Sequence, residues 1–304
     1  MKLLVLGAGG QVGRELCRLA WPAGYRIAAF DRGGLDITQR EAIFAAVARE
    51  RPDIVINAAA YTAVDRAESE RDAAWAGNCT GPANLAAACG DAAVPLIHLS
   101  TDYVFDGTKT GPYREDDPVA PLGVYGKSKE AGDRAVRGAL ARHVILRTAW
   151  VYSAHGNNFV KTMLRLAVAL QPTGLSRGER PVLRVVADQI GSPTSAADIA
   201  AAISAIVQQL AAGTSSWGTY HFAGGGAVTW HGFAQAIFEL ASQWRGPPPK
   251  VEAITTADFP TPARRPANSV LDSTRIGAAF GIVPLPWREA LAEVIRELHV
   301  EERA

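Results

Sequence analysis

Residues 2–13, KLLVLGAGGQVG, join a short apolar run to a glycine-rich turn and to the start of a helical pattern. An apolar run that ends at a glycine is typical of a strand buried in a parallel sheet. Gly7 permits a tight turn, Gly10 allows the backbone to approach a phosphate group, and Gly13 allows close packing of helix on strand. This order of elements predicts a dinucleotide-binding turn whose helix N-terminus receives the pyrophosphate. Its expected contacts are Gly7, Gly10, Gln11, Val12 and Gly13.

Strands and helices alternate through the first half of the chain. Expected strands lie at 2–6, 25–30, 53–57, 94–99, 144–147 and 220–223. Expected helices lie at 11–20, 38–50 (opened by a Thr38–Glu41 capping box), 73–88, 127–140, 158–169, 195–210, 230–244 and 287–300. Strands separated by helices predict right-handed crossovers and therefore an α/β fold, a Rossmann-type doubly wound parallel sheet.

The second half of the chain has a looser pattern, which predicts two regions. We expect an NAD(P)-binding domain over residues 1–150, to which about 195–224 return. A smaller, discontinuous substrate-binding region is expected over 151–194 and 225–304, with a surface loop at 171–181. This region should pack at the carboxyl edge of the sheet, where open α/β sheets bind ligands.

Composition excludes several classes of function. The 31 basic and 30 acidic side chains leave a formal net charge of +1. This is not the excess of positive charge that is typical of proteins that bind nucleic acid or an anionic membrane surface. The first apolar run is too short for a secretory signal, and no later run approaches the roughly 20 apolar residues of a membrane helix. We therefore expect a cytoplasmic protein that binds neither nucleic acid nor membrane. The three cysteines lack metal-binding spacing and are expected to be reduced.

Residues at the ends of the second and third expected strands bear on the cofactor. Asp31 stands roughly 20 residues after the glycine turn, where a carboxylate bonds the ribose 2′-OH of NAD. Arg32 can instead pair with the 2′-phosphate of NADP, or it is a solvated loop charge. Because the two residues favour different cofactors, we expect both NADH and NADPH to be accepted. The small side chains after Asn57 allow a flat ring of the cofactor to lie close to the end of the third expected strand. Further expected cofactor contacts are Asp36, Ile37, Ala58, Ala59 and Ala60.

Tyr125 and Lys129 are four residues apart at the start of an expected helix. Their side chains share a face, while Lys127 points elsewhere. A tyrosine that gives a proton near neutral pH needs a pKa below its usual value of about 10, and a nearby ammonium lowers it by favouring the phenolate. Thr101 ends the fourth expected strand, where a hydroxyl can bond a substrate carbonyl. Each signal is weak alone, but their common place at one sheet edge predicts a reductase site.

Longer motifs make the chain similar to the extended short-chain dehydrogenases/reductases and, within them, to the dTDP-4-dehydrorhamnose reductases. The similarity covers essentially the whole chain. The stretches that carry it are NAAAYTAVD (57–65), STDYVF (100–105), VYGKSK (124–129), RTAWVY (147–152), NNF (157–159), DQIGSPT (188–194) and TPARRP (261–266).

The resemblance implies an NADPH- or NADH-dependent reduction of the C4 ketone of dTDP-4-dehydro-β-L-rhamnose to dTDP-β-L-rhamnose. It implies three catalytic residues: Tyr125 as general acid, Lys129 as the partner that lowers its pKa, and Thr101 as the contact of the ketone oxygen. Tyr125 and Lys129 are also expected cofactor contacts, since Lys129 can hold the nicotinamide ribose. It also implies a homodimer. The residues alone leave open that Trp150 is a core aromatic and that the two arginines are a solvated pair. The implied substrate-binding residues are Thr62, Val64, Asp102, Tyr103, Trp150, Arg264 and Arg265.

A divalent metal is a further expectation of the family, which is associated with Mg²⁺ held by acidic residues at a dimer contact. Glu15 is in place for such a role. Ala197 stands where the resemblance leads us to expect a glutamate, and a hard cation needs oxygen ligands. The sequence therefore names Glu15 as a candidate ligand and argues against a bound Mg²⁺.

Three other functions share parts of this pattern. A dTDP-glucose 4,6-dehydratase would carry a carboxylate at the position of Tyr103, so elimination chemistry is disfavoured. A nucleotide-sugar 4-epimerase needs only a tyrosine, a lysine and a hydroxyl, and it recycles its cofactor. A non-catalytic regulatory subunit, like that of methionine adenosyltransferase, would leave the catalytic residues free to change, whereas Thr101, Tyr125 and Lys129 are all present. A reductase is the preferred interpretation.

Overall fold

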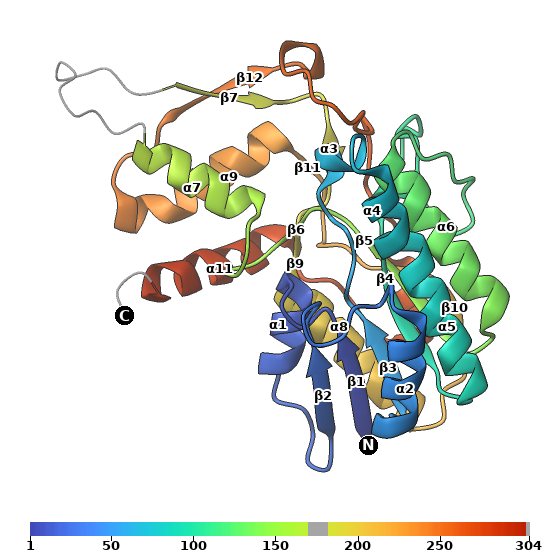
Figure 1. Cartoon of the computed structure of the whole chain (residues 1–304). Helices are drawn as coiled ribbons and strands as arrows, with labels where there is room; N and C mark the ends of the chain where they lie inside the picture. The colour runs from blue at the N-terminus through green and yellow to red at the C-terminus, as the bar shows by residue number, and fades with distance from the viewer. Residues whose placement is uncertain (170–181, 302–304) are drawn as a thin grey trace.

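The computed structural model describes residues 1–169 and 182–301. Its centre is a parallel sheet with the strand order β10-β5-β4-β3-β1-β2 (Figure 1). The apolar run after Met1 forms β1, which lies between β2 and β3 because its side chains are apolar on both faces. The strands are Lys2–Leu6 (β1), Arg26–Phe30 (β2), Ile54–Asn57 (β3), Leu96–Thr101 (β4), His143–Thr148 (β5) and Gly218–His221 (β10).

The strand order reverses between β1 and β3. Leu6, the last residue of β1, pairs with Phe30 on β2 and with Asn57 on β3, so the three strands end at one edge. Ligands of open α/β sheets bind at such a reversal, beyond the carboxyl ends of the strands. The predicted α/β fold with a doubly wound parallel sheet is confirmed.

Helices cover both faces of this sheet (Figure 1). Alternate side chains of β1 point to opposite faces, and each set belongs to a separate apolar core. One core includes α1 (Gln11–Arg18), α8 (Ala196–Ala211) and α10 (Thr274–Phe280). The opposite core includes α2 (Arg40–Glu50), α5 (Gly81–Asp91) and α6 (Val124–Ala139).

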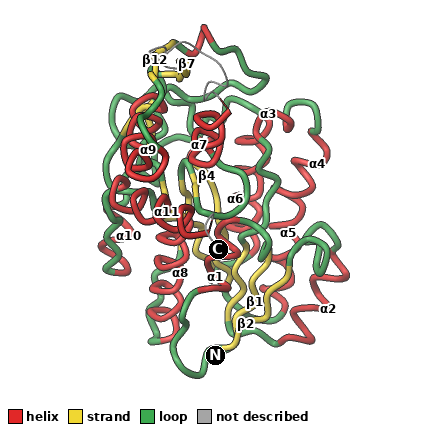
Figure 2. Tube along the Cα trace, turned by 90° about the vertical axis from the view of Figure 1, so that its left-hand side faces the viewer, coloured by secondary structure: helices red, strands yellow, loops and turns green. Residues whose placement is uncertain are grey.

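A second group of elements lies beyond the carboxyl ends of the strands (Figure 1). Figure 2 shows β7, β12, α7 and α9 at the end of the molecule opposite the N-terminus. These elements share a third apolar core, in which aromatic rings such as Phe233 are fully buried. They are α7 (Phe159–Ala169), α9 (Trp230–Arg245), α11 (Trp287–Glu301), β7 (Val182–Val186) and β12 (Lys250–Ile254). The short strands nearby are β6 (Val151–Tyr152), β8 (Ile190–Gly191), β9 (Thr194–Ser195) and β11 (Val228–Thr229).

The helix expected over residues 73–88 is interrupted in the structure. α4 (Arg71–Trp75) passes into a π-helical turn, Ala76–Thr80, before α5 begins. Asn78 lies in that turn, and its side-chain amide bonds both backbone groups of Tyr61 and the hydroxyl of Ser128. These bonds join three separate segments, so helical periodicity could not reveal them.

Three other expectations on secondary structure need correction or completion. The Thr38–Glu41 capping box is wrong: α2 begins at Arg40, and its N-cap Gln39 makes no capping side-chain bond. Strands β7 and β12 were not expected, and they pair with each other. The short helices α3 (Val64–Ala67) and α10 were also not expected. The loop expected at 171–181 lies outside the described residues.

Within the described ranges, no helix combines the length and the apolar character that crossing a lipid bilayer requires.

The contact between α6 and the π-helical turn predicts the effect of a single methyl group. A Cβ on Gly132 would lie 2.0 Å from the carbonyl oxygen of Asn78, whereas a Cβ on Gly138 of the same helix meets no atom within 4 Å. Gly132→Ala should lower the free energy of unfolding by about 1–3 kcal/mol, because the backbone must move. Gly138→Ala should raise it by about 0.5–1 kcal/mol through helix propensity. Urea unfolding of both variants checks this, and equal effects would contradict it.

Candidate active site

The glycine turn after β1 contains two glycines that the fold itself requires. Gly7 has a φ of +82°, and a Cβ there would lie 2.5 Å from the amide nitrogen of Ala59. A Cβ on Gly13 would lie 2.0 Å from the carbonyl oxygen of Gly7. Gly10 differs, because a Cβ there would meet a single described atom, the Gly7 oxygen, at 3.3 Å. The sparse surroundings of Gly10 and the absence of a side-chain cap on α1 fit the pyrophosphate of a dinucleotide.

The residues that follow Gly10 attach α1 to two parts of the molecule. Val12 is buried in the core beneath the sheet. The side-chain oxygen of Gln11 accepts bonds from Ser153 Oγ at 2.9 Å and from Asn158 Nδ2 at 3.0 Å. The helix N-terminus is therefore fixed from both sides, while its first backbone amides carry no side-chain cap.

The edge of β2 places two opposite charges beside the glycine turn. Asp31 lies next to Gly9, since a Cβ on that glycine would be 3.5 Å from the Asp31 Cβ. One carboxylate oxygen of Asp31 accepts from the Gly34 amide at 2.9 Å. Arg32 is largely exposed and pairs with Asp36 at 3.4 Å. Ile37 is buried against α5, where a Cβ on Gly81 would meet its side chain at 2.5 Å. The carboxyl end of β2 can thus present either the Asp31 carboxylate or the Arg32 guanidinium to an adenosine ribose.

The end of β3 is shaped by one buried amide. Asn57 is fully buried, and its Oδ1 accepts from the Ala59 amide at 3.1 Å. Its Nδ2 lies 3.0 Å from His98 Nδ1 on β4. These bonds hold Ala58 and Ala59, which lie half-buried next to Gly7, and Ala60 is exposed.

The three residues expected to be catalytic meet where β4 ends and α6 begins. Thr101 is buried, and its Oγ1 donates to Asp102 Oδ1 at 2.9 Å. Its hydroxyl lies near that of Tyr125 and lowers the pKa of the phenol. Lys129 follows one turn after Tyr125, is 2% exposed and donates from Nζ to the Leu99 carbonyl at 2.7 Å. Burial lowers the pKa of Lys129 to about 8.

The expected lowering of the Tyr125 pKa is not found. Burial raises this pKa, and the Thr101 hydroxyl opposes the rise only in part. Lys129 makes no resolved contribution, since its ammonium donates to the backbone of Leu99. The prediction was wrong because it counted the attraction of a charge and ignored the loss of solvent around a buried phenol.

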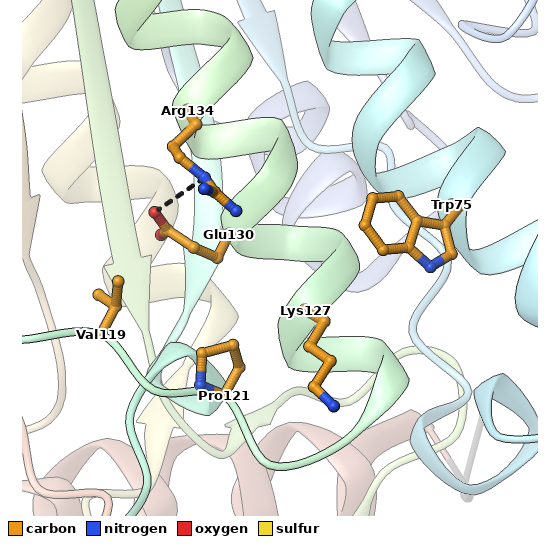
Figure 3. Close-up of a pocket in the computed structure, with 6 residues that line it drawn as sticks. All are labelled: Trp75, Val119, Pro121, Lys127, Glu130 and Arg134. Atoms are coloured by element: carbon orange, nitrogen blue, oxygen red, sulfur yellow. Dashed lines mark ion pairs between the residues drawn. The ribbon is translucent and has the colours of Figure 1, made fainter.

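Lys127 points away from this cluster, as predicted. It lines a hollow of about 340 Å³ on the outer side of α6 (Figure 3). The other lining residues are Trp75, Val119, Pro121, Glu130 and Arg134.

Asp102 and an aromatic cluster centred on Trp150 lie on the substrate-facing side predicted for Thr101. Asp102 is buried, burial raises its pKa to about 7, and its Oδ2 has no hydrogen-bond partner among the described residues. Trp150 donates to Ser269 Oγ at 3.0 Å and stacks on Trp230, with ring centroids 3.4 Å apart. A Cβ on Gly191 would come within 2.4 Å of the Trp150 ring. Both of the interpretations left open for Trp150 thus have support, since its ring is packed and lies near the site.

Arg265 is held within the fold rather than left free. Its guanidinium donates to both carboxylate oxygens of Asp65, at 3.0 and 2.7 Å. Arg264 is exposed. Thr62 is also exposed, and Val64 at the start of α3 is half-buried. Pairing with Asp65 leaves Arg264 as the better placed of the two arginines for a diphosphate in solvent.

Tyr103 faces the ring of Tyr125 edge-on, with centroids 5.4 Å apart. Four residues that reasoning from sequence did not assign thus shape the site: Asp65, Gly191, Trp230 and Ser269. The first two lie inside the quoted motif stretches, which was a usable signal. Trp230 and Ser269 lie outside them, and only the folded chain brings them to Trp150.

The pocket around Glu15 is a poor match for Mg²⁺, although His155, Glu297 and Glu301 bring potential ligand atoms within 4.8 Å of one another. Glu15, Arg18, Ala197 and Glu297 line a surface hollow of about 480 Å³. Arg18 Nη1 lies 2.7 Å from Glu297 Oε1 and also contacts His155 Nε2, which is 3.4 Å from Glu15 Oε1. A divalent cation needs several oxygen ligands, but Ala197 offers none and a guanidinium already neutralises Glu297.

Comparison with known proteins agrees with this geometry. The family model described as "RmlD substrate binding domain" matches residues 1–300. A dTDP-4-dehydrorhamnose reductase of Aggregatibacter actinomycetemcomitans is 46% identical, over 96% of this chain and 98% of its own. A crystal structure of a dTDP-4-dehydrorhamnose reductase from Clostridium acetobutylicum has a TM-score of 0.88 at 38% identity, covering 98% and 99% of the two chains. The Bacillus anthracis reductase in complex with NADP has a TM-score of 0.87 at 37% identity, covering 97% and 99%.

The match covers both the sheet and the elements beyond its edge. Sequence identities of 38–46% over nearly the whole chain indicate a shared family as well as a shared fold. The chain therefore belongs to the RmlD family, the dTDP-4-dehydrorhamnose reductases of the extended short-chain dehydrogenase/reductase superfamily.

Proposed function

We propose that this chain reduces the C4 ketone of dTDP-4-dehydro-β-L-rhamnose to the hydroxyl of dTDP-β-L-rhamnose, with NADPH or NADH as reductant. This is the last step of dTDP-L-rhamnose synthesis. The observation that carries the proposal is the cluster of Thr101, Tyr125 and Lys129, at the edge that also holds the glycine turn. Membership of the family supports the sugar nucleotide as substrate.

The residues of the cluster divide the proton chemistry between them. A bound reduced nicotinamide supplies the hydride. Tyr125 donates its phenolic proton to the ketone oxygen, and its raised pKa keeps that proton in place at neutral pH. Lys129, with a pKa of about 8, is mostly charged at neutral pH, and one turn after Tyr125 its ammonium is placed to hold the nicotinamide ribose. Thr101 can turn its single hydroxyl proton from Asp102 to the ketone oxygen and so hold that oxygen beside the phenol.

The two parts of the chain serve the two ligands in this proposal. Residues 1–150 bind the cofactor, and the segment around 195–224 supports them through α8 and β10. Residues 151–194 and 225–304 bind the dTDP-sugar, with Trp150 and Arg264 as candidate contacts. Asp31 and Arg32 favour use of both cofactors. A homodimer stays a prediction from the family resemblance, and a cytoplasmic location stays a prediction from the apolar pattern of the sequence.

A coupled assay tests the proposed reaction. dTDP-4-dehydro-L-rhamnose is made enzymatically, the protein is added with NADPH or NADH, and cofactor absorbance and sugar product are followed together. Stoichiometric cofactor oxidation with formation of dTDP-L-rhamnose is the expected result. A change of sugar configuration without net oxidation would indicate an epimerase. No change of the sugar by a folded protein that binds NADPH would favour another substrate or a regulatory subunit.

The role of Tyr125 predicts a selective loss. Tyr125→Phe should lower turnover by roughly 10²–10⁴ while the Kd for NADPH stays nearly unchanged, because the substitution removes only the proton donor. Lys129→Met should impair both turnover and cofactor binding. Tyr25→Phe serves as the control, since Tyr25 stacks on Trp21 just before β2. Unimpaired turnover of Tyr125→Phe would exclude this residue as the acid.

The pocket around Glu15 predicts independence from divalent metal. Arg18 occupies the carboxylate that a cation would need, so treatment with EDTA should leave both turnover and thermal stability of the wild-type protein unchanged. Arg18→Ala should lower the melting temperature. A loss of activity with EDTA that added Mg²⁺ restores would overturn the interpretation of this pocket.

A further inference from the structure

α6 carries a third inward-facing residue that the proposed reaction does not use. Tyr125, Lys129 and Asp133 follow one another at intervals of four residues, so they lie on one face of the helix. Asp133 has no exposed surface at all. A carboxylate in such a place needs several partners, because burial of an uncompensated charge is costly.

The partners of Asp133 come from two strands of the sheet. Its Oδ2 accepts from Ser100 Oγ on β4 at 2.8 Å and lies 3.4 Å from Arg147 Nε on β5. Its Oδ1 lies 3.6 Å from His98 Nε2. Burial raises the pKa of Asp133, and the charges of Arg147 and then Lys129 oppose that rise.

Polar side chains lie next to one another between Asp133 and the end of β3. Asn57 accepts from the Ala59 amide with its Oδ1, so its Nδ2 donates to His98 Nδ1. Burial lowers the pKa of His98 well below its usual value, so the imidazole is neutral and carries its single proton on Nε2. His98 Nε2 lies 3.6 Å from Asp133 Oδ1, beyond hydrogen-bond distance, and neither atom has a hydrogen-bond partner among the described residues. The carboxylate therefore lies close to the support of the Ala58–Ala60 turn without bonding to it.

The buried charges around Asp133 balance one another. Arg147 is 2% exposed and lies 3.3 Å from Glu130 Oε2 as well as near Asp133. The other oxygen of Glu130 meets Arg137 at 2.7 Å, and Glu130 lines the outer hollow seen in Figure 3. Glu130 and Arg147 therefore form the outer end of this network. Asp133 is the carboxylate whose charge acts on Lys129.

We propose that Asp133 is a positioning residue for Lys129: its buried carboxylate keeps the Lys129 ammonium charged beneath Tyr125 and in place to hold the cofactor ribose. The proposal rests on the proposed function of the site. The atoms that react touch Tyr125 and Thr101, and Asp133 acts on them only through Lys129.

The sign of the pH effect follows from the groups in this network. The titratable and charged groups around Lys129 and Asp133 are Tyr125, Glu130, His98 and Arg147. Burial lowers the pKa of Lys129 to about 8, and Asp133 opposes this lowering. Removal of the Asp133 charge lowers that pKa further, so Lys129 loses its proton at a lower pH. Cofactor affinity that depends on the ammonium should then be lost earlier as pH rises.

The test is a fluorescence titration of NADPH binding between about pH 7 and 10, above the titration of the 2′-phosphate near pH 6. Asp133→Asn keeps the size of the side chain and an oxygen that can accept from Ser100. The pH at which affinity is half lost should move down by about one unit or more in this variant. Asp133→Glu, which restores the charge, should return this midpoint toward the wild-type value.

Ser100→Ala is the matched control, because it removes a hydrogen bond to Asp133 and leaves every charge in place. Its midpoint should equal that of the wild type. An Asp133→Asn variant that binds more weakly by the same factor at every pH would reduce Asp133 to a structural residue and overturn the proposal. If Asp133→Asn does not fold, the double variant Asp133→Asn/Arg147→Gln, which removes one charge of each sign, is used in its place. Its pH midpoint of NADPH binding should lie below that of the single variant Arg147→Gln by the same amount.

The readout uses no sugar, so it separates two kinds of failure. A shifted midpoint together with no turnover of the dTDP-sugar would support the role of Asp133 and contradict the proposed substrate. A wild-type protein that does not bind NADPH would overturn both proposals.

Discussion

Charged side chains are buried between α6 and the carboxyl half of the sheet, and their need for partners constrains everything around them. Lys129 and Arg147 are each 2% exposed, and a buried ion costs several kcal/mol unless it is bonded and neutralised. Lys129 donates to the Leu99 carbonyl and feels the charge of Asp133. Arg147 pairs with Glu130 and Asp133, although its Nη1 has no hydrogen-bond partner among the described residues. α6 must therefore pack with these residues inward. The same orientation brings Tyr125 to the sheet edge beside Thr101.

The parts of the site that could be predicted from sequence are those with a local cause. Gly7 and Gly13 are required by atoms of the same turn and the neighbouring strand end, so their spacing alone located the turn. Tyr125 and Lys129 share a helix face because they are four residues apart. The electrostatics of the pair could not be derived in this way, since burial depends on how α6 packs on the sheet.

Contacts between distant segments account for what the sequence did not reveal. Asp65 and Arg265 are two hundred residues apart and still pair through two hydrogen bonds. The stacking of Trp150 on Trp230 depends on Gly191, from a third segment, for its space. β7 has the sequence VLRVV, a β-branched run typical of a strand that the sequence reasoning did not use, and it pairs with β12. Such pairings build the part of the site that we propose binds the substrate, whereas the part proposed for the cofactor is built from consecutive elements.

The central claim is that this edge transfers a hydride from the cofactor to C4 of the sugar. The most direct measurement supplies NADPH deuterated at C4 of the nicotinamide, in each of its two configurations, and locates deuterium in the product by NMR and mass spectrometry. We predict one deuterium at C4 of dTDP-L-rhamnose per turnover from one configuration and none from the other. A converted sugar that carries no deuterium from either cofactor would contradict the claim.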